Sequence, residues 1–414
     1  MFIKSLHIKG MLSFQEMSLE MRPLNVLIGP NASGKSNLIE IIALLQSLPR
    51  DLTGFISASG GINEWLWKGN DNGLIRSGRI DAVFDNPTLP NPTFTKPLCY
   101  GLQISSSFPY MTIVEEFLEN EQAQSLREPY RHFQVREGSG KIWSKSWLGE
   151  NEREIRIRPS WEEWIPRDEQ KTEAAVLTRG HSVLREIRDP VLYPEISSIS
   201  NRLDYIHLYR EWNMGRNSGI RKPQQTDIPN FYLLEDFSNL ALVLNRMQRL
   251  PVFREIEENL RKFYELYDQV GVMIQANTAQ LWLREKGLQD VIPASRLSDG
   301  TLRYLALLTI LCHPTPPPLV CIEEPELGLH PELIPELGRL LISASERTQL
   351  IVTTHSRSLI DRLWEDVESV VVCERDFDSG SEFKRLSEDK LEKWLERYEL
   401  GELWGKGVLG GNRW

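Results

Sequence analysis

The residues best suited to chemistry lie at 29–36, a stretch that reads GPNASGKS and matches the pattern GxxxxGK[ST]. An apolar run at 24–28 precedes it, and a segment with helical spacing follows it. In such a phosphate-binding loop the glycines let backbone N–H groups turn towards phosphate oxygens. We expect Lys35 to reach the outer phosphates of a nucleotide and the Ser36 hydroxyl to bind Mg²⁺. The residues predicted to contact the nucleotide are Asn31, Ala32, Ser33, Gly34, Lys35, Ser36 and Asn37.

Two adjacent carboxylates, Glu323 and Glu324, end a second apolar run at 319–322. Neighbouring residues on a strand point to opposite sides, so the two acids would perform different tasks. We expect Glu323 to hold Mg²⁺ through water, and Glu324 to polarise the water that attacks a γ-phosphate. The alternative is a solvated strand end, an interpretation that the phosphate-binding loop elsewhere in the chain disfavours.

Two further candidates follow predicted elements. His355 comes after the strand expected at 349–353, where an open α/β sheet places its ligands, and a neutral imidazole there would donate to a γ-phosphate. A lone histidine is more often structural, but the position of this one after the acidic strand favours a functional role. Ser298, Asp299 and Gly300 open a predicted helix, with Ser298 as its N-cap. That pattern indicates either an ordinary helix start or an anion site.

The elements that must position these residues alternate between strand and helix. The succession from about residue 298 to residue 372 predicts a mostly parallel sheet flanked by helices, the α/β fold of a P-loop NTPase. Helical spacing at 230–270 predicts a two-helix arm, too short for a long coiled coil, and residues 110–230 have no clear periodicity. Other strands are expected at 2–8, 17–21, 24–28, 79–84, 98–104, 271–275 and 280–285, and helices at 35–48 and 298–312.

Composition limits the classes of function. The chain of 414 residues is 41% hydrophobic and carries 48 Lys and Arg residues against 58 Asp and Glu residues, a net charge of −10. A surface that coats DNA throughout is therefore excluded, and any nucleic-acid contact must be a local patch. The four cysteines lack CxxC spacing and are expected as core thiols in a reducing compartment. Without a signal-like or bilayer-spanning apolar stretch, we expect a cytoplasmic protein with no membrane partner.

The motifs together resemble the ATP-binding-cassette class of P-loop ATPases. The likeness is greatest to the RecF/SMC/Rad50-like branch, including AAA-type predicted ATPases grouped with the overcoming-lysogenization-defect proteins. It is carried by GPNASGKSN, the preceding FIKSLHIKGMLSF, LSDGT, LVCIEEPELGLHP and TTHS, within about the first 50 residues and 295–360. The resemblance implies ATP as ligand, Mg²⁺ as cofactor and hydrolysis at sites shared between two copies.

In the head-to-tail dimer that the resemblance implies, Ser298, Asp299 and Gly300 of one copy complete the other copy's nucleotide site. Asp299 departs from the family pattern because a small residue is usual there, and its charge would either weaken closure or bind the partner's N–H groups. Glu323 replaces the usual aspartate, and its extra methylene should not prevent Mg²⁺ binding. The glutamine that often contacts the metal is not identifiable, with Gln103 and Gln134 as the two candidates.

The expected domain organisation is discontinuous. Residues 1–105 and 271–380 would form the ATPase domain, 106–270 an inserted mixed or helical lobe, and 381–414 a C-terminal tail. After His355 only 59 residues (414 − 355) remain, too few for the nuclease domain that overcoming-lysogenization-defect proteins carry there.

Two cellular roles remain open for this ATPase. One is work on DNA in repair, maintenance or anti-phage defence, and the other is an ATP-controlled switch that binds and releases an effector protein in trans. A transporter motor fits less well, because no hydrophobic surface helix is present for a membrane partner. The DNA hypothesis depends on a local basic cluster comprising Arg202, Arg210, Arg216, Arg221 and Lys222.

Overall fold

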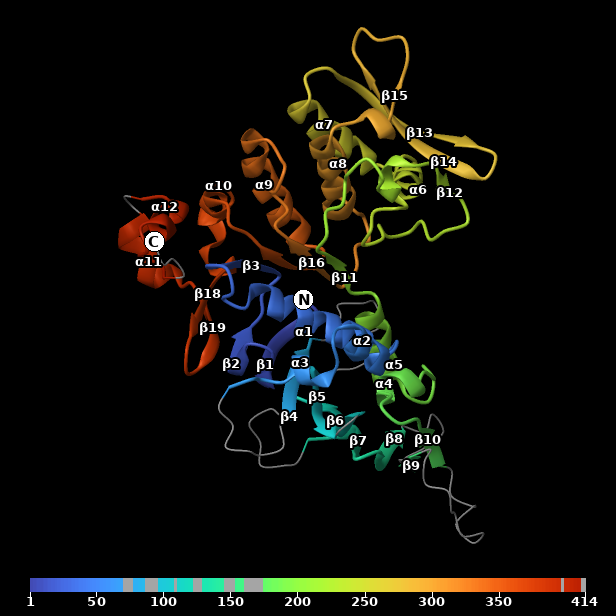
Figure 1. The fold of residues 1–414 in the computed structure, drawn as a ribbon, viewed down its shortest axis with the longest axis vertical. Coiled ribbons are helices and arrows are strands. Elements are labelled where there is room, and N and C mark those ends of the chain that lie inside the picture. Colours follow the sequence, from blue (N-terminus) through green and yellow to red (C-terminus); the bar gives the residue numbers. More distant parts are fainter. Residues whose placement is uncertain are drawn as a thin grey trace. The chain divides into compact units, whose positions relative to one another are not determined.

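The computed structural model describes residues 1–69, 77–85, 96–107, 110–121, 129–144, 153–159, 174–395 and 398–410 (Figure 1). The chain divides into two compact units. The first unit comprises Met1–Arg22, Gly29–Ile206 and Val371–Arg385, and the second comprises Pro23–Ile28, His207–Val370 and Leu386–Trp414. The boundary at residue 206 falls inside the segment 106–270 that the sequence suggested as one inserted lobe. The assignment of that segment to a separate domain stays a prediction.

The first unit contains a long run of strands, in the order β10-β9-β8-β7-β6-β5-β4-β1-β2-β19-β18. All neighbours whose register is defined pair antiparallel except β9 and β10, which pair parallel. The bounds are β1 Ile3–Met11, β2 Phe14–Glu20, β4 Ser77–Phe84, β5 Leu98–Ser107, β6 Tyr110–Asn120, β7 Arg131–Arg136, β8 Ser139–Ser144, β9 Arg153–Pro159, β10 Ala174–Leu177, β18 Val370–Asp376 and β19 Gly380–Arg385.

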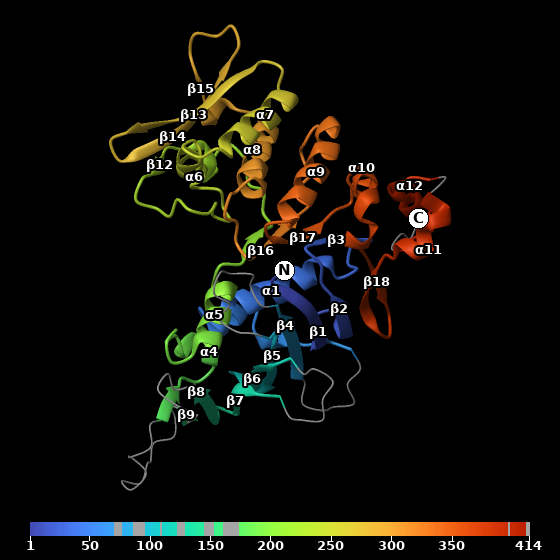
Figure 2. The same ribbon diagram turned by 180° about the vertical axis from the view of Figure 1, so that it is seen from behind.

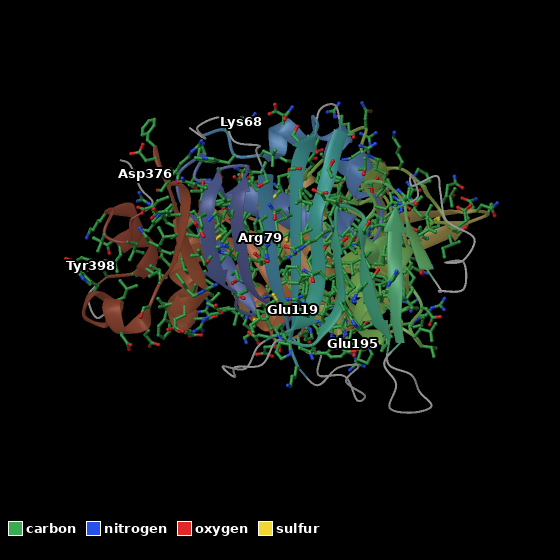
Figure 3. The ribbon with its side chains drawn as sticks, turned by 90° about the horizontal axis from the view of Figure 1, so that it is seen from below. Lys68, Arg79, Glu119, Glu195, Asp376 and Tyr398 are labelled. Atoms are coloured by element: carbon green, nitrogen blue, oxygen red, sulfur yellow. The ribbon has the colours of Figure 1, made fainter. Side chains whose placement is uncertain are left out.

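This antiparallel sheet has one apolar and one charged face, because buried and partly exposed residues alternate along strands such as β4. On the charged face Arg79 lies 2.8 Å from Asp81 and 3.3 Å from Glu115, and Arg131 lies 3.2 Å from Glu119. Arg79 and Glu119 are labelled in Figure 3. The candidate glutamines are also side-chain donors here: Gln103 bonds Ser77 and Gln134 bonds Glu115.

Five helices complete the described part of the first unit. They are α1 Lys35–Ser47, α2 Leu52–Ala58, α3 Ile62–Trp65, α4 Val183–Glu186 and α5 Pro194–Asp204. Ten of the 13 residues of α1 are buried, including the apolar face predicted from the sequence. The Gln46 side chain donates to Ile206 O at 2.7 Å, which fixes the C-terminal part of α1 against the segment after α5. The helix that follows the phosphate-binding loop is therefore rigidly held.

Four parallel strands form the base of the second unit, in the order β3-β17-β16-β11. Their bounds are β3 Leu24–Ile28, β17 Gln349–Thr353, β16 Leu319–Glu323 and β11 His207–Tyr209. β3, β17 and β16 are nearly continuous apolar runs, as expected for parallel strands covered on both faces. The predicted α/β P-loop fold is confirmed. Parallel pairing nevertheless involves fewer strands than expected, because the strands between residues 77 and 159 form antiparallel neighbours.

Helices of the second unit flank these strands. The α8 helix, Asp299–Leu311, lies beside α9, Ile334–Ser345 (Figures 1 and 2), and α9 packs on β3 and β17. Further helical elements of this unit are η2 Gly219–Arg221, η3 Ala294–Arg296, η4 Pro331–Leu333, α10 Arg357–Asp361, η5 Arg362–Ser369, α11 Glu388–Leu395 and α12 Leu400–Gly405. The helix predicted at 298–312 is α8, within one residue at each end, and the strand predicted at 349–353 is β17.

A small second sheet, in the order β12-β14-β13 with β15 on β14, also belongs to this unit. Its strands are β12 Gln224–Gln225, β13 Tyr267–Gln275, β14 Thr278–Glu285 and β15 Ile292–Pro293. The two helices expected within 230–270 are α6, Leu240–Met247, and α7, Phe253–Phe263, and both pack against β13 and α8. They therefore cover this sheet instead of projecting as an arm.

Two expectations from composition can be examined within the described residues. Cys312, Cys321 and Cys373 are buried thiols, as predicted, whereas Cys99 is partly exposed. Burial raises the pKa of the Cys99 and Cys312 thiols to about 12. In the part of the chain that the structure describes, no helix combines the length and hydrophobicity needed to cross a lipid bilayer.

Candidate functional site

The phosphate-binding loop follows β3 in the chain and leads into α1, and two of its glycines have backbones that other residues rarely adopt. Gly29 has φ 151°, and a Cβ there would lie 2.2 Å from Cys373 O. Gly34 has φ 99°, and a Cβ would lie 2.4 Å from the Ser381 Oγ. Ala32 has φ 64° as well. The loop therefore holds a strained, compact turn that requires glycine at both positions.

Lys35 and Ser33 have polar atoms suited to a phosphate ligand. The buried Lys35 Nζ donates to two carbonyls of its own loop, Gly29 O at 2.8 Å and Pro30 O at 2.9 Å. The Ser33 Oγ is buried and finds no hydrogen-bond partner among the described residues. Phosphate oxygens would supply acceptors for both groups. Asn31, Ala32 and Ser36 are exposed, as residues facing a ligand would be.

The carboxyl end of β16 carries the acidic pair, and Glu324 has an unusual backbone. Its φ is 44°, in the left-handed region that costs a non-glycine residue about 1 to 3 kcal/mol. The Glu324 N–H donates to Thr353 O at 3.0 Å, so β17 holds the strained residue in place. Strain of this kind is concentrated at functional sites. Among the described residues Glu324 shares a positive φ with five other non-glycine residues, Ala32 included, and of these six it is the one that the acidic motif contains.

His355 lies close to Glu324 in the second unit. Its Nε2 is 3.7 Å from the Glu324 Oε1, and both side chains are 36% exposed. Both groups are therefore accessible to a ligand at the end of the parallel strands. The structure brings together these two predicted residues, while their roles in catalysis stay predictions.

Glu323 has two neighbours that sequence reasoning did not connect with it. Trp212 Nε1 donates to Glu323 O at 2.7 Å, and the Arg210 Nε lies 4.0 Å from the Glu323 Oε1. The Glu323 side chain is 22% exposed and keeps carboxylate oxygens of the kind that Mg²⁺ binds. The Ser36 hydroxyl belongs to an exposed residue and is another oxygen ligand of that kind. The donor types of these two residues fit the metal that the motifs imply.

The Ser298 segment opens α8 as predicted. The Ser298 Oγ accepts a hydrogen bond from the Thr301 N–H at 3.0 Å, which makes Ser298 the N-cap. A Cβ added to Gly300 would lie 3.0 Å from Gly328 O, so a larger side chain there would press on the loop after β16. Ser298 and Gly300 are therefore fixed at the exposed start of a well-formed helix.

Asp299 is paired within its own chain, which neither interpretation of its charge anticipated. Its Oδ1 accepts from the Arg221 Nη2. The buried Arg221 guanidinium also donates to three carbonyls, Met214 O at 2.7 Å, Ala294 O at 3.0 Å and Leu297 O at 2.6 Å. Arg221 therefore offsets the Asp299 charge and fixes the segment before α8.

The five residues of the predicted basic cluster differ in exposure and in their neighbours. Arg221 is buried in the contacts just described, and Arg210 lies near Glu323. In the first unit, the Arg202 guanidinium lies 4.1 Å from the centre of the Phe2 ring, and burial lowers its pKa to about 10. Guanidinium groups that are close in sequence thus contact different internal partners, and DNA binding by the cluster stays a prediction. Only Arg216 and Lys222 of the five are exposed.

Replacing Arg221 by methionine should lower the free energy of unfolding by about 3 kcal/mol, because three buried carbonyls would lose their donor. Asp299→Asn should cost less than about 1 kcal/mol, since the Asp299 side chain is 69% exposed. Thermal and urea unfolding measure both changes, with exposed Arg216→Met as the matched control. An equal stability of the two arginine variants would show that the Arg221 contacts contribute nothing.

Comparisons with known proteins come from a protein family and from solved structures. The family described as "AAA domain, putative AbiEii toxin, Type IV TA system" matches residues 24–82 and 112–361. An SMC head bound to the C-winged-helix domain of ScpA aligns at 13% identity with a TM-score of 0.53, covering 94% of this chain and 99% of that one. An Smc head with an extended coiled coil, bound to the C-terminal domain of ScpA derived from Pyrococcus furiosus, aligns at 14% identity with a TM-score of 0.52, covering 95% and 98%.

No curated protein matches the sequence. At these identities the likeness to SMC heads concerns the fold alone, whereas the family match spans most of the chain. The chain therefore belongs to the AAA-domain family described as putative AbiEii toxin of a type IV TA system, and it folds as an ABC/SMC-like P-loop ATPase.

Proposed function

We propose that the protein binds ATP with Mg²⁺ and hydrolyses it to ADP and phosphate. The observation that carries this proposal is the strained turn at 29–36. It contains the buried Lys35, which donates to Gly29 O, and the buried Ser33 Oγ, which has no hydrogen-bond partner among the described residues. ATP would offer phosphate oxygens to Lys35 and Ser33, and the backbone N–H groups of residues 31–37 would bind the same phosphates. The family match adds nucleotide hydrolysis to this expectation.

The metal and the carboxylates would divide the chemistry. Mg²⁺, when bound, would neutralise charge that develops on the phosphates, held by the Ser36 hydroxyl and by Glu323 through water. Glu324 would accept a proton from, or orient, the attacking water, and its exposed carboxylate beside His355 suits that task. The imidazole would donate a hydrogen bond to the γ-phosphate. Lys35 would offset the negative charge of the transition state.

We further propose that two copies share their nucleotide sites. The exposed N-terminus of α8 presents Ser298 and Gly300, and the positive end of the helix dipole there would suit the γ-phosphate bound by the partner copy. The Arg221 contact to Asp299 supports this arrangement, because it compensates a carboxylate that would otherwise repel the phosphate.

Mixing two inactive variants tests the shared site. Lys35→Ala lacks a phosphate ligand in its own copy, and Ser298→Arg blocks the cap that it offers to the partner. Random mixing makes half of the dimers mixed, each with one intact site of two, so about a quarter of the wild-type ATPase rate should return. Circular dichroism first establishes that both variants fold. No recovery on mixing would mean that each copy completes its own site.

The cellular role that the observations favour is a switch acting on a protein partner. Three of the five arginines and lysines proposed for DNA contact have internal neighbours instead. The matched SMC heads are bound to ScpA, and the family description names a toxin of a TA system. Both suggest heads that act through other proteins. DNA maintenance or anti-phage defence remains the second candidate, and ATPase assays with and without duplex DNA at low and moderate salt separate the two.

A further inference from the structure

One buried carboxylate outside the predicted site, Glu326, joins the two loops that carry Glu324 and His355. Glu326 is 9% exposed. Its Oε1 accepts one hydrogen bond from the Thr354 Oγ1 at 2.5 Å and another from the His355 backbone N–H at 3.0 Å. The segment after β16 is thereby tied to the segment after β17. The contact is made to the backbone N–H of His355 and does not involve its imidazole.

Thr354 connects Glu326 both to β3 and to the segment that begins α10. It is fully buried, and its own N–H donates to Leu27 O at 3.2 Å, which holds it to β3. Its Oγ1 also accepts from the Ser356 N–H at 3.0 Å. The hydroxyl can therefore donate to Glu326 and accept from Ser356 at once. Removing the Glu326 acceptor would free both the hydroxyl and the His355 N–H, and the backbone that aims the imidazole would lose its restraint.

The geometry of His355 and Glu324 depends on that backbone. The His355 Nε2 and the Glu324 Oε1 are 3.7 Å apart. Glu324 belongs to the segment after β16 and His355 to the segment after β17, so this distance depends on how the two segments are held. Reacting groups displaced by about 1 Å lose roughly a hundredfold in rate. The Glu326 carboxylate holds the segments after β16 and β17 together. It could therefore affect the rate of hydrolysis without contacting the nucleotide.

Glu326 also has an electrostatic neighbour, which offers an alternative explanation of its burial. The Glu326 Oε2 and the Arg303 Nε are both buried without a hydrogen-bond partner among the residues that the structure describes. Burial lowers the pKa of Arg303 to about 10, and the charge of Glu326 opposes that shift. Arg303 itself donates to Leu327 O and lies over the Trp212 ring, with 4.6 Å between its guanidinium carbon and the ring centre. Glu326 would then serve only to balance a buried cation.

We propose that Glu326 is a positioning residue for ATP hydrolysis, acting through its hydrogen bonds to Thr354 and His355. This inference rests on the proposed ATPase function. The hydrogen bonds require only an acceptor oxygen, whereas balancing Arg303 requires a negative charge. Glutamine keeps the oxygen and loses the charge, so it separates the two explanations.

The experiment compares Glu326→Ala, Glu326→Gln and Thr354→Val by steady-state ATP hydrolysis. Alanine should lower kcat about 10- to 100-fold with KM changed less than threefold, because the aim of His355 and Glu324 matters in the transition state and not for ATP binding. Glutamine should restore kcat to within about threefold of the wild type. Thr354→Val should lower kcat about 3- to 10-fold, and adding it to Glu326→Ala should cause little further loss, since both variants lack the hydrogen bond between Thr354 and Glu326.

Exposed Glu332→Ala is the matched control, because this side chain is 90% exposed on the same segment. A wild-type kcat in Glu326→Ala would overturn the inference. It would also be overturned if Glu326→Gln were as slow and as unstable as Glu326→Ala, because Glu326 would then serve to balance the charge of Arg303. Should Glu326→Ala fail to fold, Thr354→Val decides, and an unchanged kcat there would also overturn the inference. A wild-type protein that binds no ATP would instead overturn the proposed function.

Discussion

Replacing Glu324 by glutamine should reduce the rate of ATP hydrolysis at least about a hundredfold while ATP binding persists. The amide has nearly the same shape but cannot take a proton from water, so only the reaction step is lost. The left-handed backbone at this position is unchanged by the substitution, and the Glu324 N–H keeps its bond to Thr353 O. The variant should therefore accumulate with ATP bound, in the closed dimer if two copies share the sites.

Three measurements check this expectation. Single-turnover hydrolysis gives the rate of the chemical step, equilibrium titration with ATP gives the affinity, and light scattering gives the mass of the complex with and without ATP. Glu332→Gln is the control, since it makes the same change at a 90% exposed side chain. Hydrolysis by Glu324→Gln at the wild-type rate would show that another group activates the water, with Glu323 the next to test.

Replacing Lys35 by alanine should weaken ATP binding by about a hundredfold or more, because charged hydrogen bonds to phosphate contribute about 1.5 to 3 kcal/mol each. In the structure the Lys35 Nζ already lies within its loop, bonded to Gly29 O and Pro30 O. ATP would need only to exchange these carbonyls for phosphate oxygens. Gly29 O and Pro30 O lose this donor in the variant, so circular dichroism must first establish that it folds.

Calorimetric titration with ATP and Mg²⁺ measures the loss, and Lys68→Ala is a suitable control because that lysine is 57% exposed in the first unit. The two variants lose the same charge, so a non-specific electrostatic effect would appear in both. Equal ATP affinity for Lys35→Ala and the wild type would remove the loop at 29–36 from the nucleotide site and with it the proposed function.

The predictable parts of this fold are those whose signal is local. The apolar runs at 24–28 and 349–353 are β3 and β17 with the bounds that were expected, and α8 starts at the residue after its predicted N-cap. Residues 110–230 defeated the same reasoning because their described strands take part in different sheets: β6 to β9 pair antiparallel, β11 lies beside the parallel strand β16, and β12 belongs to the small second sheet. Buried Glu116 illustrates the difficulty: it fixes the start of α4 by accepting from Ser182 at 2.6 Å and Val183 N at 2.9 Å, more than 60 residues away.

The candidate site shows the same division. Lys35, Glu323, Glu324, His355 and Ser298 were recognisable because each stands in a short motif. The sequence around Trp212, Arg221 or Glu326 does not indicate that these residues form hydrogen bonds with motif residues. Their contacts span 111 residues from Trp212 to Glu323, 78 from Arg221 to Asp299 and 29 from Glu326 to His355. A motif names the groups that meet the ligand, whereas the supporting contacts depend on tertiary structure.

The left-handed backbone of Glu324 has a consequence for anyone who seeks a more durable form of this protein. Glycine or asparagine would relax that residue, so a library sorted for heat resistance alone would enrich exchanges at this position. The selected variants would be more stable but inactive, since the carboxylate needed to activate water would be gone. Stability and catalytic turnover thus place opposite demands on the residue at position 324. Directed evolution of the protein must therefore select for both properties.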